Sequence, residues 1–155
     1  MLLGLLDLSS AFDTVDHQIL FDRLQLSYSF KGDVLGWFRS YLTGRSQYIR
    51  YNGVQSESVL VLYGVPQGSV LGPVLFILYS ADVINIATKH GFFAHSYADD
   101  LQIYDHSSQT TCLNLVPRMS ACIEEISTWT ASHHLKLNPS KTELICLGSS
   151  RRLKH

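Results

Sequence analysis

The alternation of apolar and polar positions predicts that the chain begins with a strand and a helix. Residues 1–8 are an almost unbroken apolar run with the acid Asp7 near its end, which is the pattern of a short buried strand. Asp13 and Asp16 are candidate N-caps, because aspartate accepts hydrogen bonds from the free N–H groups that open a helix. The apolar stripe that follows them runs on to Leu24, so the first helix is expected there.

The next segment predicts a second helix and then a β-hairpin. Asp33 is the expected cap of this helix and Gly44 its stop. Asn52-Gly53 lies between the β-branched and aromatic segments 47–51 and 58–63, and both residues tolerate the positive φ of a tight hairpin turn. The prediction of this helix depends on an apolar stripe at the spacing i, i+3, i+4, i+7 and i+8. The stripe consists of Val34, Trp37, Phe38, Tyr41 and Leu42.

The middle of the chain predicts a loop, a helix and two further strands. The loop at 64–68 contains Gly and Pro and leads into a helix at about 69–87. Pro73 fits the first turn of that helix, where a missing N–H costs least. Strands are expected at 91–97 and 101–106, separated by a short acidic turn.

The C-terminal part predicts a long helix and a last strand. The strand is expected at 142–147 after a turn at Asn138-Pro139, and a basic tail, 151–155, follows the single domain 1–150. Strands and helices mix, with a hairpin among them, so the fold class is α+β and not a strictly alternating βαβ fold. The long helix covers roughly 115–132 and has the apolar stripe Leu115, Met119, Cys122, Ile123, Ile126 and Trp129.

Length and composition narrow the class of protein. The chain has 155 residues, enough for one domain, and its 46% apolar and 16% charged residues exclude a disordered or low-complexity chain. Twelve Lys and Arg and thirteen Asp and Glu give a net charge near zero, so the charge alone does not indicate a nucleic-acid partner. Three cysteines without a CxxC pair argue against a disulfide framework and a tetrathiolate zinc site, and favour a reducing compartment.

The sequence does not have the pattern of a signal peptide or a membrane span. Asp7 interrupts the apolar start before the apolar core of a signal peptide is long enough. The apolar stretch that begins at Val70 contains Gly72 and Pro73 and is too short and too interrupted to cross a bilayer. We therefore expect an intracellular protein, in the nucleus or the cytoplasm, that is neither secreted nor bound to a membrane.

Two adjacent carboxylates, Asp99 and Asp100, are the most unusual feature of the sequence. They lie between two apolar strands, where a turn normally carries Gly or Asn. Neighbouring carboxylates repel each other unless a cation neutralises them, and a hard divalent ion such as Mg²⁺ prefers carboxylate oxygens. The alternative is a polar hairpin tip that only solvates the turn.

Asp7 is a third acid in an unusual place, at the end of a buried strand where an unpartnered carboxylate is costly. Parallel or antiparallel pairing of its strand with the strands around Asp99 and Asp100 would bring three carboxylates together. Three acids can hold two metal ions about 3.5–4 Å apart, the arrangement used for phosphoryl transfer. The alternative is that Asp7 only caps the following helix, and the spacing alone does not decide between the two.

The loop that reads GVPQGS at 64–69 is a candidate binding loop, because glycines let a backbone approach a ligand and a helix N-terminus favours an anion. It lacks the Lys of a Walker loop. The alternative is an ordinary connector. The seven histidines show no metal-ligand spacing with the cysteines, so we interpret them as structural or solvated and do not expect zinc.

Four segments taken together resemble one family. The segments similar to motifs A, B, C and D of reverse transcriptases read LLDLSSAFDTVDH (5–17), GVPQGSVLGP (64–73), YADD (97–100) and LNPSKTE (137–143). The resemblance is to the reverse transcriptases, or RNA-directed DNA polymerases, of LINE-type non-LTR retrotransposons. A lone Asp-Asp pair is a weak signal, but four motifs in the family's order, over nearly the whole chain, are a specific one.

The resemblance implies a polymerase palm, an antiparallel sheet backed by helices, with a two-metal site. It implies that Asp7, Asp99 and Asp100 are the catalytic, metal-binding carboxylates, and that the peptide carbonyl of Leu8 is a further ligand. The expected cofactors are two Mg²⁺ ions, with Mn²⁺ as the alternative. The implied reaction joins a dNTP to the 3′-hydroxyl of a DNA primer on an RNA template, in which positioning and charge stabilisation dominate.

The resemblance also implies how the nucleotide is bound. Phe12 would lie under the incoming sugar, where its ring would clash with a 2′-hydroxyl and so favour deoxynucleotides. Gln67 and Gly68 would line the pocket for the template and the incoming nucleotide. Lys141 would lie near the triphosphate as a proton donor to the leaving pyrophosphate.

The sequence departs from the family's pattern at both ends. Met1 lies only six residues before Asp7, where the fingers region of the family would precede it. The chain ends soon after the motif D segment, where the primer grip and thumb would follow. We therefore interpret the chain as a truncated palm with fingers and thumb missing, and expect weak or no polymerase activity from it in isolation.

Two other hypotheses come from different classes. The first is a non-catalytic remnant of a retrotransposon that keeps the palm and binds nucleic acid or protein through exposed faces. The second is a chain that does not fold stably, because a sheet cut at both ends leaves unpaired edges. The presence of Phe12 beside the three acids favours an enzyme, since a binding module needs none of the four. The oligomeric state is left open.

Overall fold

The chain forms two compact units, one built from both of its ends and one from its middle. The computed structural model describes residues 1–106 and 112–147, and of residues 112–114 the backbone alone. The first unit, here called the sheet unit, consists of Met1–Ser9 and Ser80–His155, and the second, the hairpin unit, of Ser10–Tyr79. The predicted basic tail, 151–155, lies outside the described residues.

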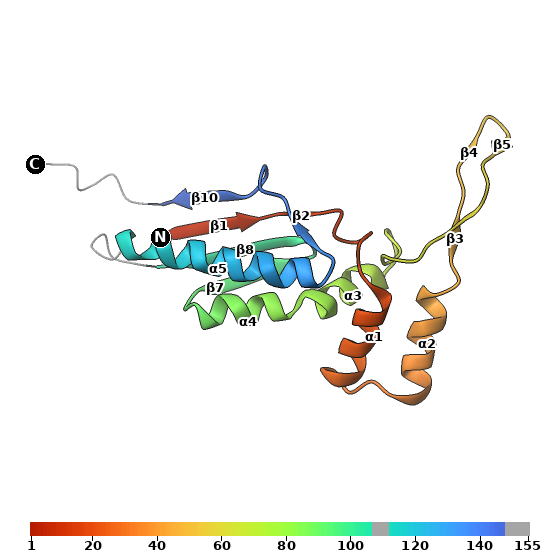
Figure 1. The fold of residues 1–155 in the computed structure, drawn as a ribbon, viewed down its shortest axis with the longest axis horizontal. Coiled ribbons are helices and arrows are strands. Elements are labelled where there is room, and N and C mark those ends of the chain that lie inside the picture. The colour runs from red at the N-terminus through yellow and green to blue at the C-terminus, as the bar shows by residue number, and fades with distance from the viewer. Residues whose placement is uncertain (107–111, 148–155) are drawn as a thin grey trace, which may run out of the picture. The chain divides into compact units, whose positions relative to one another are not determined.

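An antiparallel sheet is the centre of the sheet unit. Its strands run in the order β10-β1-β8-β7, and each neighbouring pair is antiparallel (Figure 1). A separate two-stranded ladder joins β2 to β9. The strands are β1 (Leu2–Leu6), β2 (Leu8–Ser9), β7 (Phe93–Tyr97), β8 (Asp100–Asp105), β9 (Lys136–Leu137) and β10 (Glu143–Cys146). The antiparallel sheet that the sequence predicted is therefore present.

Two helices, α4 (Asp82–Lys89) and α5 (Cys112–Ser132), pack on one face of this sheet. Alternate side chains of the two central strands point to these helices, and the residues between them point to the other face. The stripe predicted for the long helix forms much of the core. The core residues of the strands and of α5 are Leu2, Leu6, Leu101, Ile103, Leu115, Met119, Cys122 and Ile126.

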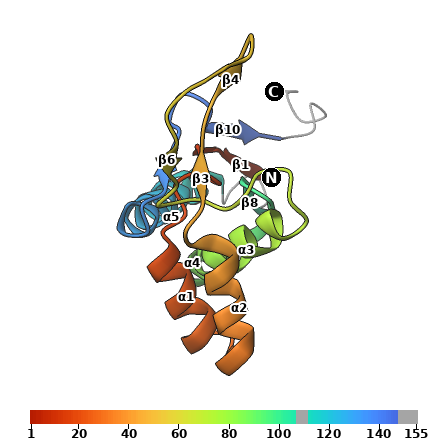
Figure 2. The same cartoon turned by 90° about the vertical axis from the view of Figure 1, so that its right-hand side faces the viewer.

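The hairpin unit contains the first two helices and a long two-stranded arm (Figure 2). The arm closes at Asn52-Gly53, where both residues have positive φ, +48° and +77°, as predicted for a tight hairpin turn. The elements are α1 (His17–Leu26), α2 (Gly32–Leu42), β3 (Ser46–Gln47), β4 (Arg50–Tyr51), β5 (Val54–Gln55), β6 (Val59–Leu60) and α3 (Leu71–Ser80).

Of the predicted helix caps, Asp16 is confirmed and Asp33 is not. Asp16 caps α1, since its Oδ1 accepts a hydrogen bond from the N–H of Ile19 at 3.0 Å. Asp33 does not cap α2, because the helix already begins at Gly32 and places Asp33 inside its first turn. The N-cap position is occupied by Lys31, which makes no capping hydrogen bond through its side chain.

Replacing these two aspartates tests the difference between them. The Asp16→Ala variant should lose about 1 kcal/mol of unfolding free energy, the typical effect of removing an N-cap. Asp33→Ala is the matched control and loses only the attraction to the helix dipole, which salt screens. Urea unfolding followed by circular dichroism at high salt measures both. Equal losses in the two variants would contradict the assignment of the caps.

The apolar stripe of α2 is less buried than predicted. Val34 and Trp37 are each 52% exposed, and the buried residues are Leu35, which the stripe did not include, and Leu42. The aromatic side chains pack on one another instead, and the ring centroids of Trp37 and Tyr41 are stacked 5.5 Å apart. The apolar spacing identified the helix correctly but did not identify its buried face.

The helix predicted at about 69–87 is divided. α3 ends at Ser80 and α4 begins at Asp82, with Ala81 between them. By length and composition alone, the 19 residues Leu71–Lys89 could cross a membrane, so the prediction that this stretch is too short was wrong on length. A core helix of a globular protein passes the same test, and 44% of the most apolar window is buried here. The finding is weak evidence for a membrane.

Candidate functional site

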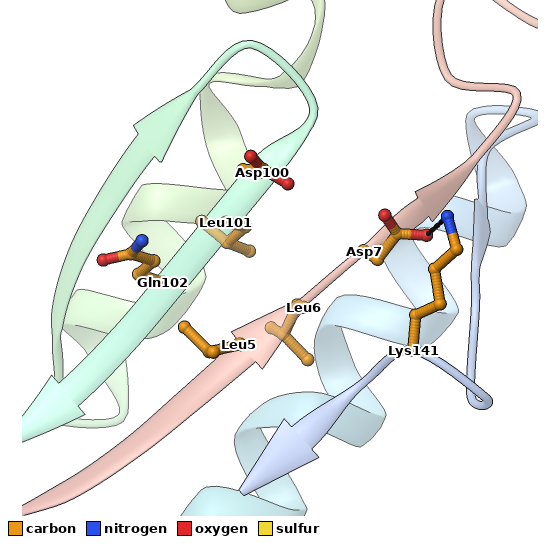
Figure 3. Close-up of a pocket in the computed structure, with 7 residues that line it drawn as sticks. All are labelled: Leu5, Leu6, Asp7, Asp100, Leu101, Gln102 and Lys141. Atoms are coloured by element: carbon orange, nitrogen blue, oxygen red, sulfur yellow. Dashed lines mark ion pairs between the residues drawn. The ribbon is translucent and has the colours of Figure 1, made fainter. Parts of the chain in front are cut away.

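Strand pairing brings two of the predicted carboxylates together. The antiparallel register of β1 and β8 sets Leu5 opposite Gln102 and Leu6 opposite Leu101. Continued by one position beyond β1, this register would set Asp7 opposite Asp100, and both residues line the same pocket. Figure 3 shows Asp7 just beyond the end of β1, with Asp100 at the start of β8 beside it. Of the two pairings left open by the sequence, the structure has the antiparallel one.

Asp99 lies in the turn that precedes Asp100. β7 ends at Tyr97 and β8 starts at Asp100, so the hairpin loop consists of Ala98 and Asp99. Ala98 has a φ of +53°, a conformation that is strained for a residue with a Cβ and that is often found at functional sites. Within residues 1–106 and 112–147, no group of three or more His, Cys, Asp or Glu side chains is close enough to hold a metal ion. The structure therefore groups two of the three acids.

The two grouped carboxylates face a pocket of about 270 Å³. Its walls come from the end of β1, the start of β8 and the turn that follows β9 (Figure 3). Two carboxylates, an amide and an ammonium group converge on it from these three segments. The lining residues are Leu5, Leu6, Asp7, Asp100, Leu101, Gln102 and Lys141.

The carboxylate of Asp7 has the electrostatic character of a cation ligand. Its side chain is 23% exposed, and its Oδ2 atom is buried without a hydrogen-bond partner in the described part of the chain. The ammonium of Lys141 lies 3.6 Å from that oxygen, which makes an ion pair but exceeds a hydrogen-bond distance. A buried carboxylate oxygen without a donor is costly, so this atom fits a bound cation.

A tight turn holds Lys141 beside Asp7. The N–H of Asn138 donates to the carbonyl of Asp7 at 2.8 Å, and the carbonyl of Asn138 accepts from the N–H of Lys141 at 3.2 Å. The side-chain Oδ1 of Asn138 accepts from both the N–H and the hydroxyl of Ser140. The backbone of Lys141 is thus fixed relative to Asp7, while its side chain is 68% exposed.

The predicted binding loop of the hairpin unit is held against the segment before α1. Gly64 donates its N–H to the carbonyl of Val15, and Val65 donates to that of Phe12, each at 2.8 Å. His17 is buried, and its Nε2 lies 2.8 Å from the carbonyl oxygen of Gly64, as a hydrogen bond between the two requires. Residues of the motif A and motif B segments therefore form one cluster, and His17 is structural, as the sequence indicated.

Asp13 has a role that the sequence analysis missed. It is not the cap of α1. Its Oδ1 accepts a hydrogen bond from Nε2 of Gln67 at 2.9 Å and so orients the amide of a predicted binding residue. Gly68 follows with a φ of +75°, and the ring of Phe12 packs on Phe76 with the centroids 5.0 Å apart. The local sequence could not predict this role of Asp13, because an aspartate can either cap a helix or accept a hydrogen bond from a distant side chain.

Two titratable groups of α5, Cys122 and Glu125, have shifted pKa values. Burial, helped by the charge of Glu125, raises the pKa of the Cys122 thiol to about 11, so this cysteine is neither a nucleophile nor a ready metal ligand. Hydrogen bonds from Lys89 and His90 hold the pKa of Glu125 below its ordinary value. The carboxylate of Glu125 on α5 thus holds Lys89 at the end of α4 and His90 next to it.

Comparison with known proteins identifies the family. The family model for reverse transcriptase (RNA-dependent DNA polymerase) matches residues 2–154. The chain belongs to the reverse transcriptase family. The resemblance of its four motifs to this family is thereby confirmed.

Curated relatives of this reverse transcriptase chain come from fly transposons. It is 30% identical over 154 residues to a probable RNA-directed DNA polymerase from transposon X-element of Drosophila melanogaster, which covers 95% of this chain and 16% of the relative. It is 31% identical over 143 residues to the corresponding protein from transposon BS, with 88% and 15% covered. The mobile element jockey of Drosophila funebris encodes a 27% identical RNA-directed DNA polymerase. The chain thus spans about one sixth of the X-element protein, and the similarity to LINE-type elements is confirmed.

Solved structures confirm the palm fold. The telomerase of Candida albicans, solved with the TWJ fragment of telomeric RNA, matches 97% of this chain and 27% of its own with a TM-score of 0.71. Apo telomerase of Candida tropicalis matches 96% and 31%, with a TM-score of 0.68. The sequence identities are 14% and 15%, so these likenesses show the fold alone.

Proposed function

We propose that this chain is the catalytic palm of an RNA-directed DNA polymerase. In the proposed reaction, the 3′-hydroxyl of a DNA primer paired to an RNA template attacks the α-phosphate of a dNTP, and pyrophosphate leaves. The observation that carries the proposal is that Asp7, directly after β1, and Asp100, at the start of its antiparallel partner β8, line one pocket. Membership of the reverse transcriptase family supports it.

The donor set of this pocket suits Mg²⁺, or Mn²⁺ in its place. Mg²⁺ is commonly bound through one or two carboxylates together with substrate phosphates, and Asp7 and Asp100 supply two carboxylates here. In the two-metal arrangement, Asp99 and the peptide carbonyl of Leu8 would add to this set. The bound cations would activate the attacking hydroxyl and stabilise the charge of the leaving pyrophosphate.

The protein's own side chains would position the substrates. Gln67, held by Asp13, and the neighbouring Gly68 would line the site of the template and the incoming nucleotide. Phe12, whose ring is fixed against Phe76, would exclude a ribose 2′-hydroxyl. Lys141, beside the pocket, would donate a proton to the pyrophosphate oxygen as it leaves. Because the chain spans 16% of the X-element relative, we expect it to extend primers weakly or not at all by itself.

A chimeric enzyme tests the proposal with the rest of the polymerase supplied. Residues 2–154 of this chain would replace the matching segment of the jockey polymerase, and extension of a DNA primer on an RNA template would be measured with dNTPs and Mg²⁺. The chimera should extend the primer, and Asp100→Asn should reduce the rate by at least about a thousandfold, since metal-ion catalysis contributes most of the charge stabilisation.

The controls separate folding from chemistry. The isolated chain and its Asp99→Ala variant, assayed in parallel, show whether the palm works alone. Asp33→Ala, which changes an exposed acid of α2 that does not line the carboxylate pocket, should leave the chimera active. A folded chimera without activity, beside an active jockey parent, would contradict the proposal and favour a remnant that only binds.

A further inference from the structure

We propose that Lys141 is a tethered cation at Asp7 which a divalent cation must displace, so that cation binding and release of the Lys141 ammonium form one coupled step. This inference rests on the proposed function of Asp7 and Asp100 as a metal site and adds a device that regulates it. In this inference, Lys141 lowers the affinity of the site for divalent cations. This effect is separate from the proton donation proposed for the same residue.

The first support is the position of the ammonium. Nζ of Lys141 lies 3.6 Å from Oδ2 of Asp7, and this oxygen accepts no hydrogen bond from the described residues. Both side chains line the pocket that also contains Asp100 (Figure 3). The ammonium therefore lies at the oxygen atom that a divalent cation would use.

The second support is the looseness of this ion pair compared with another in the same unit. Nζ of Lys89 donates to Oε1 of Glu125 at 2.7 Å, and Nε2 of His90 lies 2.8 Å from Oε2 of the same carboxylate. Both oxygens of the Glu125 carboxylate therefore have a partner at hydrogen-bond distance. At 3.6 Å, the ammonium of Lys141 balances the charge of Asp7 but does not donate a hydrogen bond to Oδ2. This oxygen can therefore still accept a stronger ligand.

The third support is that Lys141 can leave at little cost. Its backbone is fixed by the Asn138 turn, but its side chain is 68% exposed. The ion pair is exposed on its Lys141 side, so solvent can take up the released ammonium, and an ammonium beside a divalent cation would be repelled by it. A cation that binds between Asp7 and Asp100 should therefore drive the ammonium away from Asp7.

The displaced ammonium would become available to an anion at the same pocket. Lys141 stays anchored at the pocket edge by its backbone, so its free charge could meet the phosphates that arrive with the cation. Thermodynamic linkage makes this coupling reciprocal. An anion that binds the ammonium of Lys141 must also strengthen cation binding at Asp7. The coupling thus favours binding of the cation together with an anionic substrate.

Mn²⁺ binding to the purified 155-residue chain tests the displacement directly. Free Mn²⁺ would be counted by electron paramagnetic resonance for wild type, Lys141→Met, Lys141→Arg, Asp7→Asn and the double variant Asp7→Asn/Lys141→Met. Removing the competing ammonium should lower the Kd of Lys141→Met about two- to fivefold, the factor that corresponds to a weak ion pair. Lys141→Arg should bind like wild type, and Asp7→Asn should bind weakly with or without Lys141.

The matched control is Lys136→Met, which removes the same charge from the neighbouring strand β9. If it tightens Mn²⁺ binding as much as Lys141→Met does, the effect is general electrostatics and the proposal is wrong. An unchanged Kd in Lys141→Met, with binding still lost in Asp7→Asn, overturns the displacement and leaves the metal site standing. Binding that is absent, or unaffected by Asp7→Asn, overturns both the metal site and this inference.

Chemical modification of lysines gives a second readout that needs no variant. Acetylation by an amine-reactive reagent, followed by mass spectrometry, should become faster at Lys141 when Mg²⁺ is added. Lys89, paired with Glu125 in the same chain, is the internal control and should keep its rate. A Lys141 rate that does not respond to saturating Mg²⁺ contradicts the proposal.

Discussion

The Gly64→Ala variant is expected to lose about 3 kcal/mol or more of unfolding free energy, the sum of a steric clash and a left-handed backbone. A Cβ at this position would lie 2.9 Å from Cα and O of Asp13 and from O of Phe12, all of them backbone atoms that cannot move aside cheaply. The residue also has a φ of +83°, which a side chain disfavours. Since stabilities of whole domains are often only about 5–15 kcal/mol, this single change should remove a large share of the unfolding free energy.

Two other glycines serve as controls for this variant. Gly68 has a similar φ of +75° but no atom within 4 Å of a built Cβ, so Gly68→Ala should lose only about 1 kcal/mol, for the backbone conformation. Gly36 lies inside α2 with open space around it, and Gly36→Ala should gain about 0.5–1 kcal/mol. Urea unfolding monitored by circular dichroism measures all three. A Gly64→Ala loss no larger than that of Gly68→Ala would show that the loop does not approach the Phe12–Asp13 backbone.

The Ile103→Ala variant is expected to destabilise the sheet unit by about 2–5 kcal/mol, the range for removing a large side chain from a packed core. Ile103 lies in the middle of the central strand β8, is fully buried, and belongs to the core cluster with Met119 and Ile126 of α5. Its truncation leaves a cavity under the strand that carries Asp100. Thermal unfolding by calorimetry gives the change in unfolding free energy.

The neighbouring residue provides the control for this strand. Gln102 points to the opposite face, where it is exposed, so Gln102→Ala should change the unfolding free energy by less than about 0.5 kcal/mol. A large loss of stability at Ile103 and a negligible one at Gln102 are expected for a strand with one buried face. If Gln102→Ala were the more damaging of the two, the assignment of the buried and exposed faces of β8 would be wrong.

The parts of the fold that sequence predicts well are those decided by local patterns. The stripe from Leu115 to Ile126 predicted the buried face of α5, because one apolar side chain per turn has only one way to face a core. Asn52-Gly53 predicted the hairpin, because few other residue pairs tolerate positive φ twice in succession. The motif segments predicted the family, which the family model confirms.

The parts that sequence could not predict depend on contacts between distant residues. The pairing of the Asp7 and Asp100 strands is such a contact, and apolar runs alone allow either direction. Asp13 could cap a helix or hold Gln67, and only the position of the loop at 64–68 decides. The exposure of Trp37 likewise depends on which neighbours α2 acquires, and not on its own periodicity. The role of Asp99, Phe12 and Lys141 in catalysis stays a prediction.

The antiparallel register of β1 and β8 also determines which genetic lesions this chain should tolerate. Conservative replacements within Leu2–Leu6 change the packing but keep the carboxylate of Asp7 on the pocket face. The in-frame loss of a single codon in the same strand shifts every later position by one, and alternate side chains point to opposite faces. Asp7 would then turn toward the helices, away from Asp100. In these strands, the number of residues should therefore be under stricter selection than their identity.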